Sequence, residues 1–102
     1  MKPGIYLIVN FDWPSPFEPE HGKVARALHD AVTEADWITE TVAASGGIGG
    51  SASSIWVFRL ENYSALDKLL RDYDDPVHQA YAACFQTMIN VTEMVKEEVL
   101  FA

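Results

Sequence analysis

The sequence predicts an α+β fold with elements in the order β-α-β-β-α-β, and three observations lead to this prediction. Runs rich in β-branched and aromatic residues alternate with stretches in which apolar residues recur at helical spacing. A glycine-rich stretch joins the second and third strand-like runs with no helical pattern between them. Prolines stand near the ends of the expected elements, where they do not interrupt a hydrogen-bond ladder. This order is the ferredoxin-like arrangement, an antiparallel four-stranded sheet with its helices on one face.

Each element follows from its local pattern. Residues 4–13 are β-rich and lie between Pro3 and Pro14, so they are expected to form the first strand. Over 19–35 the apolar residues recur at helical spacing, and Pro19 between two glutamates suits the first turn of a helix. The remaining expected elements are strands over 36–44, 54–62 and 90–101 and helical segments over 63–73 and 74–88.

The last two helical segments are separated by Pro76. Ser64 is the expected N-cap of the first segment, because a side-chain oxygen there can accept a free backbone N–H. Cys84 lies in the apolar stripe of the second segment and is expected to be a core thiol rather than a nucleophile.

The stretch GGIGG at 46–50 could belong to a phosphate-binding loop or to a turn. A phosphate loop needs a strand before the glycines and a helix after them, with a lysine and a hydroxyl residue near the phosphates. Here a strand is expected on both sides, and no lysine lies between Lys23 and Lys68. We therefore expect a hairpin connection, in which glycine supplies the positive φ that such turns require.

Composition limits the function classes. The 102 residues fit one domain spanning 1–102, and an apolar share of 49% is enough for a packed core. Seven basic against fifteen acidic residues give a net charge of -8, which argues against nucleic acid and anionic membranes as partners. A single cysteine excludes an intrachain disulfide, and the first apolar run ends at Asp12 and Pro14 without a signal-peptide cleavage site. A cytoplasmic location is expected by default.

The strand pattern predicts that both faces of the sheet are covered. In the first strand the odd positions, from Ile5 to Trp13, are all apolar and are expected to meet the helices. The 54–62 strand is apolar on both faces, with Ile55 and Val57 on one and Trp56 on the other. Because the helices can cover only one face, we expect a second copy of the chain on the open face, giving a homodimer.

These features resemble a known superfamily. The βαββαβ order, the glycine hairpin and the segment WVFRLENYSALDKLLRDYDDPVHQAY are similar to the dimeric α+β barrel superfamily. The resemblance covers nearly the whole chain and implies a dimer in which two ferredoxin-like sheets pack face to face. The superfamily includes isomerases, cofactor-free monooxygenases, haem-degrading enzymes and proteins of no known activity.

Two branches of the superfamily imply different site residues. The monooxygenase and haem-degrading branch uses an Asn, a Trp and a His; Asn10 matches, but Leu69 and Tyr81 stand where the other two are needed. The YciI-like branch pairs a His early in the first helix with an Asp in an Asp-Pro step, and here His21 and Asp75 match. That branch has Gly-Pro after its second strand, where this chain has Ser-Gly-Gly.

His21 and Asp75 are therefore the expected catalytic pair. His21 is in phase with the apolar face of its helix and could serve as general acid or base, with Asp75 orienting it. The alternative is structural, with His21 at a helix start and Asp75 as a helix cap. His29 and His78 are expected on the surface, and the histidine spacing predicts no metal site.

The expected ligand is a small, mostly apolar organic molecule between the sheet and the helices, bound without a cofactor. Arg59 could meet a carboxylate or an acidic group of the ligand. The candidate ligand-binding residues are Tyr6, Asn10, Trp56, Phe58 and Arg59. Two functions remain open: a cofactor-free enzyme that uses histidine acid/base or monooxygenase-like chemistry, and a non-catalytic binding or interaction module.

Overall fold

The structure is a computed structural model that describes residues 2–48 and 53–101. The elements are β1 (Ile5–Asp12), α1 (Pro19–Glu34), β2 (Ile38–Ser45), β3 (Ser54–Leu60), α2 (Tyr63–Arg71), α3 (Pro76–Gln86) and β4 (Ile89–Glu97). The predicted order is confirmed, with the second helical region divided into α2 and α3 at the Asp-Pro step.

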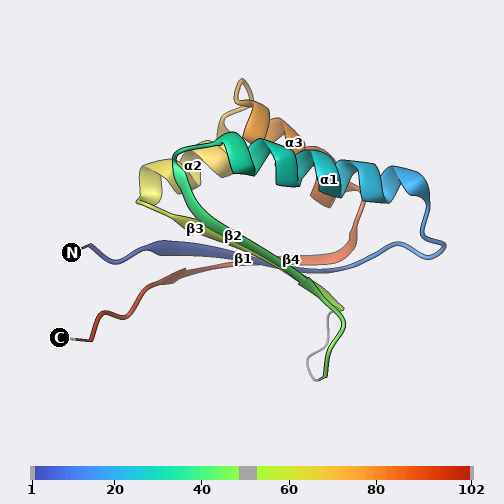
Figure 1. Cartoon of the computed structure of the whole chain (residues 1–102), viewed down its shortest axis with the longest axis horizontal. Coiled ribbons are helices and arrows are strands. Elements are labelled where there is room, and N and C mark those ends of the chain that lie inside the picture. Colours follow the sequence, from blue (N-terminus) through green and yellow to red (C-terminus); the bar gives the residue numbers. More distant parts are fainter. Residues whose placement is uncertain (1, 49–52, 102) are drawn as a thin grey trace.

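The strands form one antiparallel four-stranded sheet in the order β2-β3-β1-β4, as the ferredoxin-like arrangement requires. The helices α1, α2 and α3 lie on one side of this sheet, and no element within 2–48 and 53–101 covers the other side, here called the open face (Figure 1). β1 and β3 are the central strands, whereas β2 and β4 are the edges.

The core lies between the helices and the inner face of the central strands. The odd positions of β1 from Ile5 to Phe11 are buried, as predicted, and they alternate with half-buried even positions. β3 contributes Trp56, Phe58 and Leu60 to the same layer. The helices close it mainly with Leu28, Val32, Leu69, Val77, Tyr81, Cys84 and Phe85.

Local chemistry fixes where the helices begin. α1 has Pro19 in its first turn, where the missing N–H breaks no hydrogen bond. α2 is capped by Asn62, whose side-chain oxygen accepts the backbone N–H of Ala65 at 2.9 Å. The predicted cap Ser64 was therefore wrong: it lies inside the first turn, because the helix begins at Tyr63.

The glycine-rich stretch connects β2 to β3 directly, so the hairpin prediction is confirmed for the residues that the structure describes. Gly46 and Gly47 have φ values of 78° and 85°, which glycine adopts without the steric penalty of a side chain. The backbone N–H of Gly46 donates to the carbonyl of Ser53 at 2.8 Å. The rest of the predicted loop, 49–52, lies outside the described residues.

The last strand is shorter than predicted, because β4 ends at Glu97 and not at 101. Its neighbour β1 begins at Ile5, which is the partner of Glu97, so no strand remains beside the residues that follow. Residues 99–101 are consequently exposed. No helix among the described residues is both long and apolar enough to span a membrane.

Candidate functional site

The open face of the sheet carries an apolar row that crosses all four strands. Strand register places Val42, Val57, Ile8 and Met94 side by side. Val57 and Ile8, in the centre, are half-buried, whereas Val42 and Met94 at the edges are 48% and 43% exposed. None of the helices and strands that the structure describes packs on this face in Figure 1. The row is therefore a strip of aliphatic side chains on the face of the sheet that lies opposite the helices.

A polar row lies beside the apolar row. It consists of Glu40, Arg59, Tyr6 and Lys96, again one residue from each strand. Arg59 is held firmly: its Nη1 donates to the Tyr6 hydroxyl at 2.9 Å, and its Nη2 pairs with Glu98 at 2.9 Å. The carboxylate that Arg59 was expected to contact is therefore that of Glu98.

Gly4 makes room for this arrangement. A Cβ atom at Gly4 would lie 3.0 Å from the Nε of Arg59, closer than side-chain contacts normally come. The backbone N–H of Gly4 also donates to Glu98 at 3.0 Å. The start of β1, the end of β3 and the residue after β4 are thus tied together at one end of the sheet.

The five predicted ligand-binding residues do not share a face. Tyr6, Asn10 and Arg59 belong to the open face, whereas Trp56 and Phe58 are buried on the helix side. Successive side chains of a strand point to opposite faces, so neighbours such as Phe58 and Arg59 cannot line one pocket. The five cannot act as one site, and a ligand role for any of them stays a prediction.

The structure does not bring His21 and Asp75 together. The Nδ1 of His21 accepts the backbone N–H of Glu18 at 2.9 Å, which ties it to the start of its own helix. Asp75 accepts the N–H of Val77 at 2.8 Å as the α3 cap and lies 3.5 Å from the Nζ of Lys68. The starts of α1 and α3 also lie well apart along the helical layer in Figure 1. His21 thus contacts the start of its own helix and Asp75 caps α3, which is the structural alternative to a catalytic pair. A catalytic role for either residue is untested.

A hollow of about 210 Å³ lies between α1 and the edge strand β2. Its apolar part comes from Val32 and Ile38, which are both buried. Around them lie the polar residues His29, Thr33, Thr39, Glu40 and Thr41. The register of β2 shifts between Ile38 and Glu40, which is the bulge that places Thr39 here.

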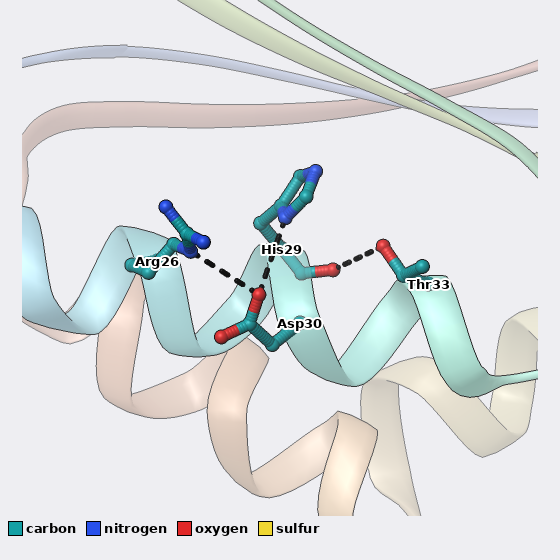
Figure 2. A network of polar contacts seen from close by, with 4 residues as sticks. All are labelled: Arg26, His29, Asp30 and Thr33. Atoms are coloured by element: carbon teal, nitrogen blue, oxygen red, sulfur yellow. Dashed lines mark hydrogen bonds and ion pairs between the residues drawn. The ribbon is translucent and has the colours of Figure 1, made fainter.

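His29 is the titratable side chain of α1 in this hollow. Figure 2 shows its ring directed from α1 toward the strands, with Nδ1 3.4 Å from the Oδ1 of Asp30. Asp30 also accepts a bond from the Nε of Arg26 at 3.2 Å, and the Thr33 hydroxyl donates to the His29 carbonyl at 2.8 Å. With Nδ1 toward the carboxylate, Nε2 is the ring atom left for a molecule in the hollow.

The sequence located His29 correctly on the surface but did not reveal the hollow. Helical spacing placed it on the flank of α1, and its side chain is indeed 61% exposed. The hollow exists because β2 lies beside this flank, and nothing in the helical periodicity carries that information. The bulge at Thr39 leaves no local sequence mark either.

His78 was wrongly predicted to lie on the surface. It is 6% exposed, and its Nδ1 lies 2.9 Å from the carbonyl oxygen of Leu69. The ring of Tyr73 meets it edge-on at 5.0 Å. The chain reverses between α2 and α3, which folds this flank of α3 against α2.

Two buried groups on α3 have raised pKa values. Burial raises the pKa of the Cys84 thiol to about 11, in agreement with a core thiol. Burial and the hydrogen bond that its hydroxyl donates to Glu93 raise the pKa of Tyr81. Within 2–48 and 53–101, no group of three or more His, Cys, Asp or Glu side chains is arranged to hold a metal ion.

Sequence comparisons give no relatives for this chain: no family model and no curated protein matches it. Solved structures do match. A dimeric ferredoxin-like protein of unknown function from Thermobifida fusca is 20% identical, with a TM-score of 0.66 over 98% of this chain and 93% of its own.

Two further solved structures share the fold. A hydroxynitrile lyase from Passiflora edulis has a TM-score of 0.79 at 8% identity, over 100% of this chain and 99% of its own. A Dabb family protein with a ferredoxin-like fold from Mesorhizobium loti has a TM-score of 0.69 at 10% identity, covering 99% and 100%. The ferredoxin-like fold is therefore confirmed, and the resemblance to the dimeric α+β barrel superfamily holds at the level of the fold.

Proposed function

We propose that this protein is a homodimer, assembled through the open face of its sheet, that binds a small organic molecule in the hollow between α1 and β2. The observation that carries the homodimer is the apolar row on a sheet whose other face is already covered by helices. Solved structures with the same fold are described as dimeric, which supports a second copy as the occupant.

The energetics favour covering this row. Fully burying an aliphatic side chain stabilises a complex by about 1.5–3 kcal/mol. Burial of the four side chains of the row would therefore offset part of the free-energy cost of association. The neighbouring polar row has Glu40 at one edge and Lys96 at the other. A two-fold pairing that reverses the strand order would set these opposite charges across the interface.

The hollow supports binding of a molecule with an apolar body and at least one hydrogen-bonding group. Val32 and Ile38 would contact the apolar body. The Nε2 of His29 and the hydroxyls of Thr33, Thr39 and Thr41 would meet the polar group. The hollow lies between a helix and the sheet, where a ligand was expected from the sequence, but none of the five residues expected to bind that ligand lines it.

A second candidate function is acid/base catalysis in the same hollow. The specific observation is that Asp30 faces the Nδ1 of His29, which orients the ring and favours Nε2 as the atom that exchanges a proton with a ligand. His29, the acid/base group of this second candidate, lies eight residues further along α1 than the His21 expected from the sequence. The hydroxynitrile lyase is an enzyme of the same fold, but its 8% identity transfers no residue role to this chain.

The homodimer is tested with a charge placed in the apolar row. Val57→Glu should convert the dimer to a monomer in size-exclusion chromatography with light scattering, because a buried unpaired carboxylate opposes association. Ala27→Glu adds the same charge on an exposed position of α1 and should leave the dimer intact. Equal masses for the two variants would contradict the proposed interface.

The ligand site is tested by titrating small organic fragments into 15N-labelled protein. Binding in the hollow should shift the backbone amide signals of Thr33, Thr39 and Thr41, and His29→Ala should weaken it about tenfold, since one polar contact is lost. Lys23→Ala, a change at a 74% exposed side chain of the same helix, should have no effect. Shifts confined to other parts of the chain would refute this location.

A further inference from the structure

The residues after β4 form an exposed apolar segment, here called the exit segment (99–101). Val99 and Phe101 are 70% and 93% exposed, and Leu100 between them is 39% exposed. Three consecutive apolar side chains outside any helix or strand bury little surface on their own chain.

The exit segment starts from a fixed point. Glu98, the residue before it, donates its backbone N–H to the Gly4 carbonyl at 2.9 Å. Its carboxylate accepts the backbone N–H of Gly4 at 3.0 Å and pairs with Arg59 at 2.9 Å. The side chain of Glu98 is 24% exposed, so it is a partly buried anchor beside the polar row.

We propose that the exit segment packs against the second copy in the homodimer, with Glu98 and Arg59 setting its direction. This inference rests on the homodimer proposed above and adds a named contact to it. The exit segment would act as a clasp: each copy would contribute three apolar side chains that its own sheet does not cover.

The direction of the chain supports this occupant. In Figure 1 the residues after β4 run on the side of the sheet opposite to the helices, which is the side of the apolar row. The anchor residue Arg59 belongs to the polar row of that face. The exit segment is therefore continuous with the surface on which the second copy is proposed to sit.

The charge of the chain argues against the main alternative, an anionic lipid surface. Three apolar residues would need nearby lysines or arginines to hold such a membrane. The exit segment instead follows Glu97 and Glu98, in a chain with a net charge of -8. A second copy needs no such attraction, because the contact would be made between apolar side chains.

The test compares two variants with wild type by sedimentation equilibrium. The double substitution Val99→Ser with Phe101→Ser should raise the dimer dissociation constant at least about tenfold, because it removes apolar contacts from both copies. Tyr73→Ser removes an aromatic ring that is 78% exposed in the turn between α2 and α3 and should change the constant less than about twofold.

The outcomes separate this inference from the homodimer itself. A dimeric wild type whose dissociation constant is unchanged by the double substitution would overturn the clasp and leave the homodimer standing. A monomeric wild type would overturn both. Loss of binding to neutral phosphatidylcholine vesicles in the double variant, with an unchanged dissociation constant, would assign the exit segment to a lipid surface and overturn the clasp.

A second measurement locates the contact directly. In a mixture of 13C-labelled and unlabelled chains, filtered NOE spectra should connect the Phe101 ring of one copy to aliphatic protons of the other. Contacts from Phe101 within one chain only, or none at all, would contradict the inference.

Discussion

The two faces of the sheet are built from the same strands but differ in what covers them. On the helix side, Leu7 and Phe58 are fully buried by residues of the same chain. On the open side, their neighbours Ile8 and Val57 are of the same apolar class yet remain half-buried. The difference teaches that this chain completes one core by itself, and the proposed homodimer would use the second face as half of another. Stability within one copy should depend on the first face, and association on the second.

The largest effect should come from adjacent residues of β1. Leu7→Ala should lower the free energy of unfolding by about 2–5 kcal/mol at any protein concentration, because it leaves a cavity in the closed core. Ile8→Ala should lower the free energy of unfolding much less in dilute protein. Its effect on the free energy of unfolding should grow as the protein concentration rises toward full dimer formation. Urea unfolding of both variants at several concentrations measures this, and identical concentration dependence would break the distinction between the faces.

The second effect is a pH dependence that belongs to the closed core. The pKa of Cys84 is about 11 in the folded chain against an ordinary value near 9, because burial disfavours the thiolate. Between these values the unfolded chain has lost the thiol proton while the folded chain keeps it, so the free energy of unfolding should fall as pH rises from about 9 to about 11. Cys84→Ala should make this decline shallower in urea unfolding under reducing conditions, and the part that begins near pH 10 should remain, because the pKa of Tyr81 is also raised in the folded chain. Parallel declines in both proteins would show that Cys84 is not the cause.

A smaller effect is expected at the end of the open face. Gly4→Ala places a Cβ atom 3.0 Å from the Arg59 Nε, so the Arg59 side chain must shift by a few tenths of an ångström, which strains its pair with Glu98. We expect a loss of about 1–2 kcal/mol in stability and a weaker dimer, because the Glu98 anchor loosens. Gly22→Ala, with only the Phe17 ring at 3.6 Å, is the control for the dimer; because Gly22 lies in α1, alanine there should raise the stability by about 0.5–1 kcal/mol. An unchanged dimer dissociation constant for Gly4→Ala would show that the contacts of Glu98 do not affect dimer formation.

The smallest effect should be at His21. Since its Nδ1 accepts the Glu18 backbone N–H, His21→Ala should cost about 1 kcal/mol, the usual value of a helix-start contact, and leave the dimer intact. Thermal unfolding and sedimentation measure the two quantities. Loss of a ligand-dependent activity with unchanged stability would instead revive His21 as a catalytic residue.

The sequence predicted what depends on local pattern. The alternation of Ile5, Leu7 and Val9 with Tyr6 and Ile8 identified the inner face, and the glycines identified the hairpin. The element order followed from these patterns and led to the fold.

The rest depended on contacts between distant segments. Val99 and Phe101 have high strand propensity, but a strand needs a neighbouring strand to pair with. β1 begins at Ile5, which pairs with Glu97, so it does not extend beside residues 99–101. The position of His29 beside β2 and the burial of His78 against α2 are likewise tertiary. The ligand set failed for a simpler reason, since alternation alone assigns Phe58 and Arg59 to opposite faces.

The most direct test of the account is the mass of the wild-type protein at equilibrium. Sedimentation equilibrium from about 1 to 100 μM should fit a reversible association to twice the chain mass of 11.4 kDa, because the open face holds an apolar row that none of the described elements covers. A single species of 11.4 kDa across that range would contradict the claim that this face completes its core with a second copy.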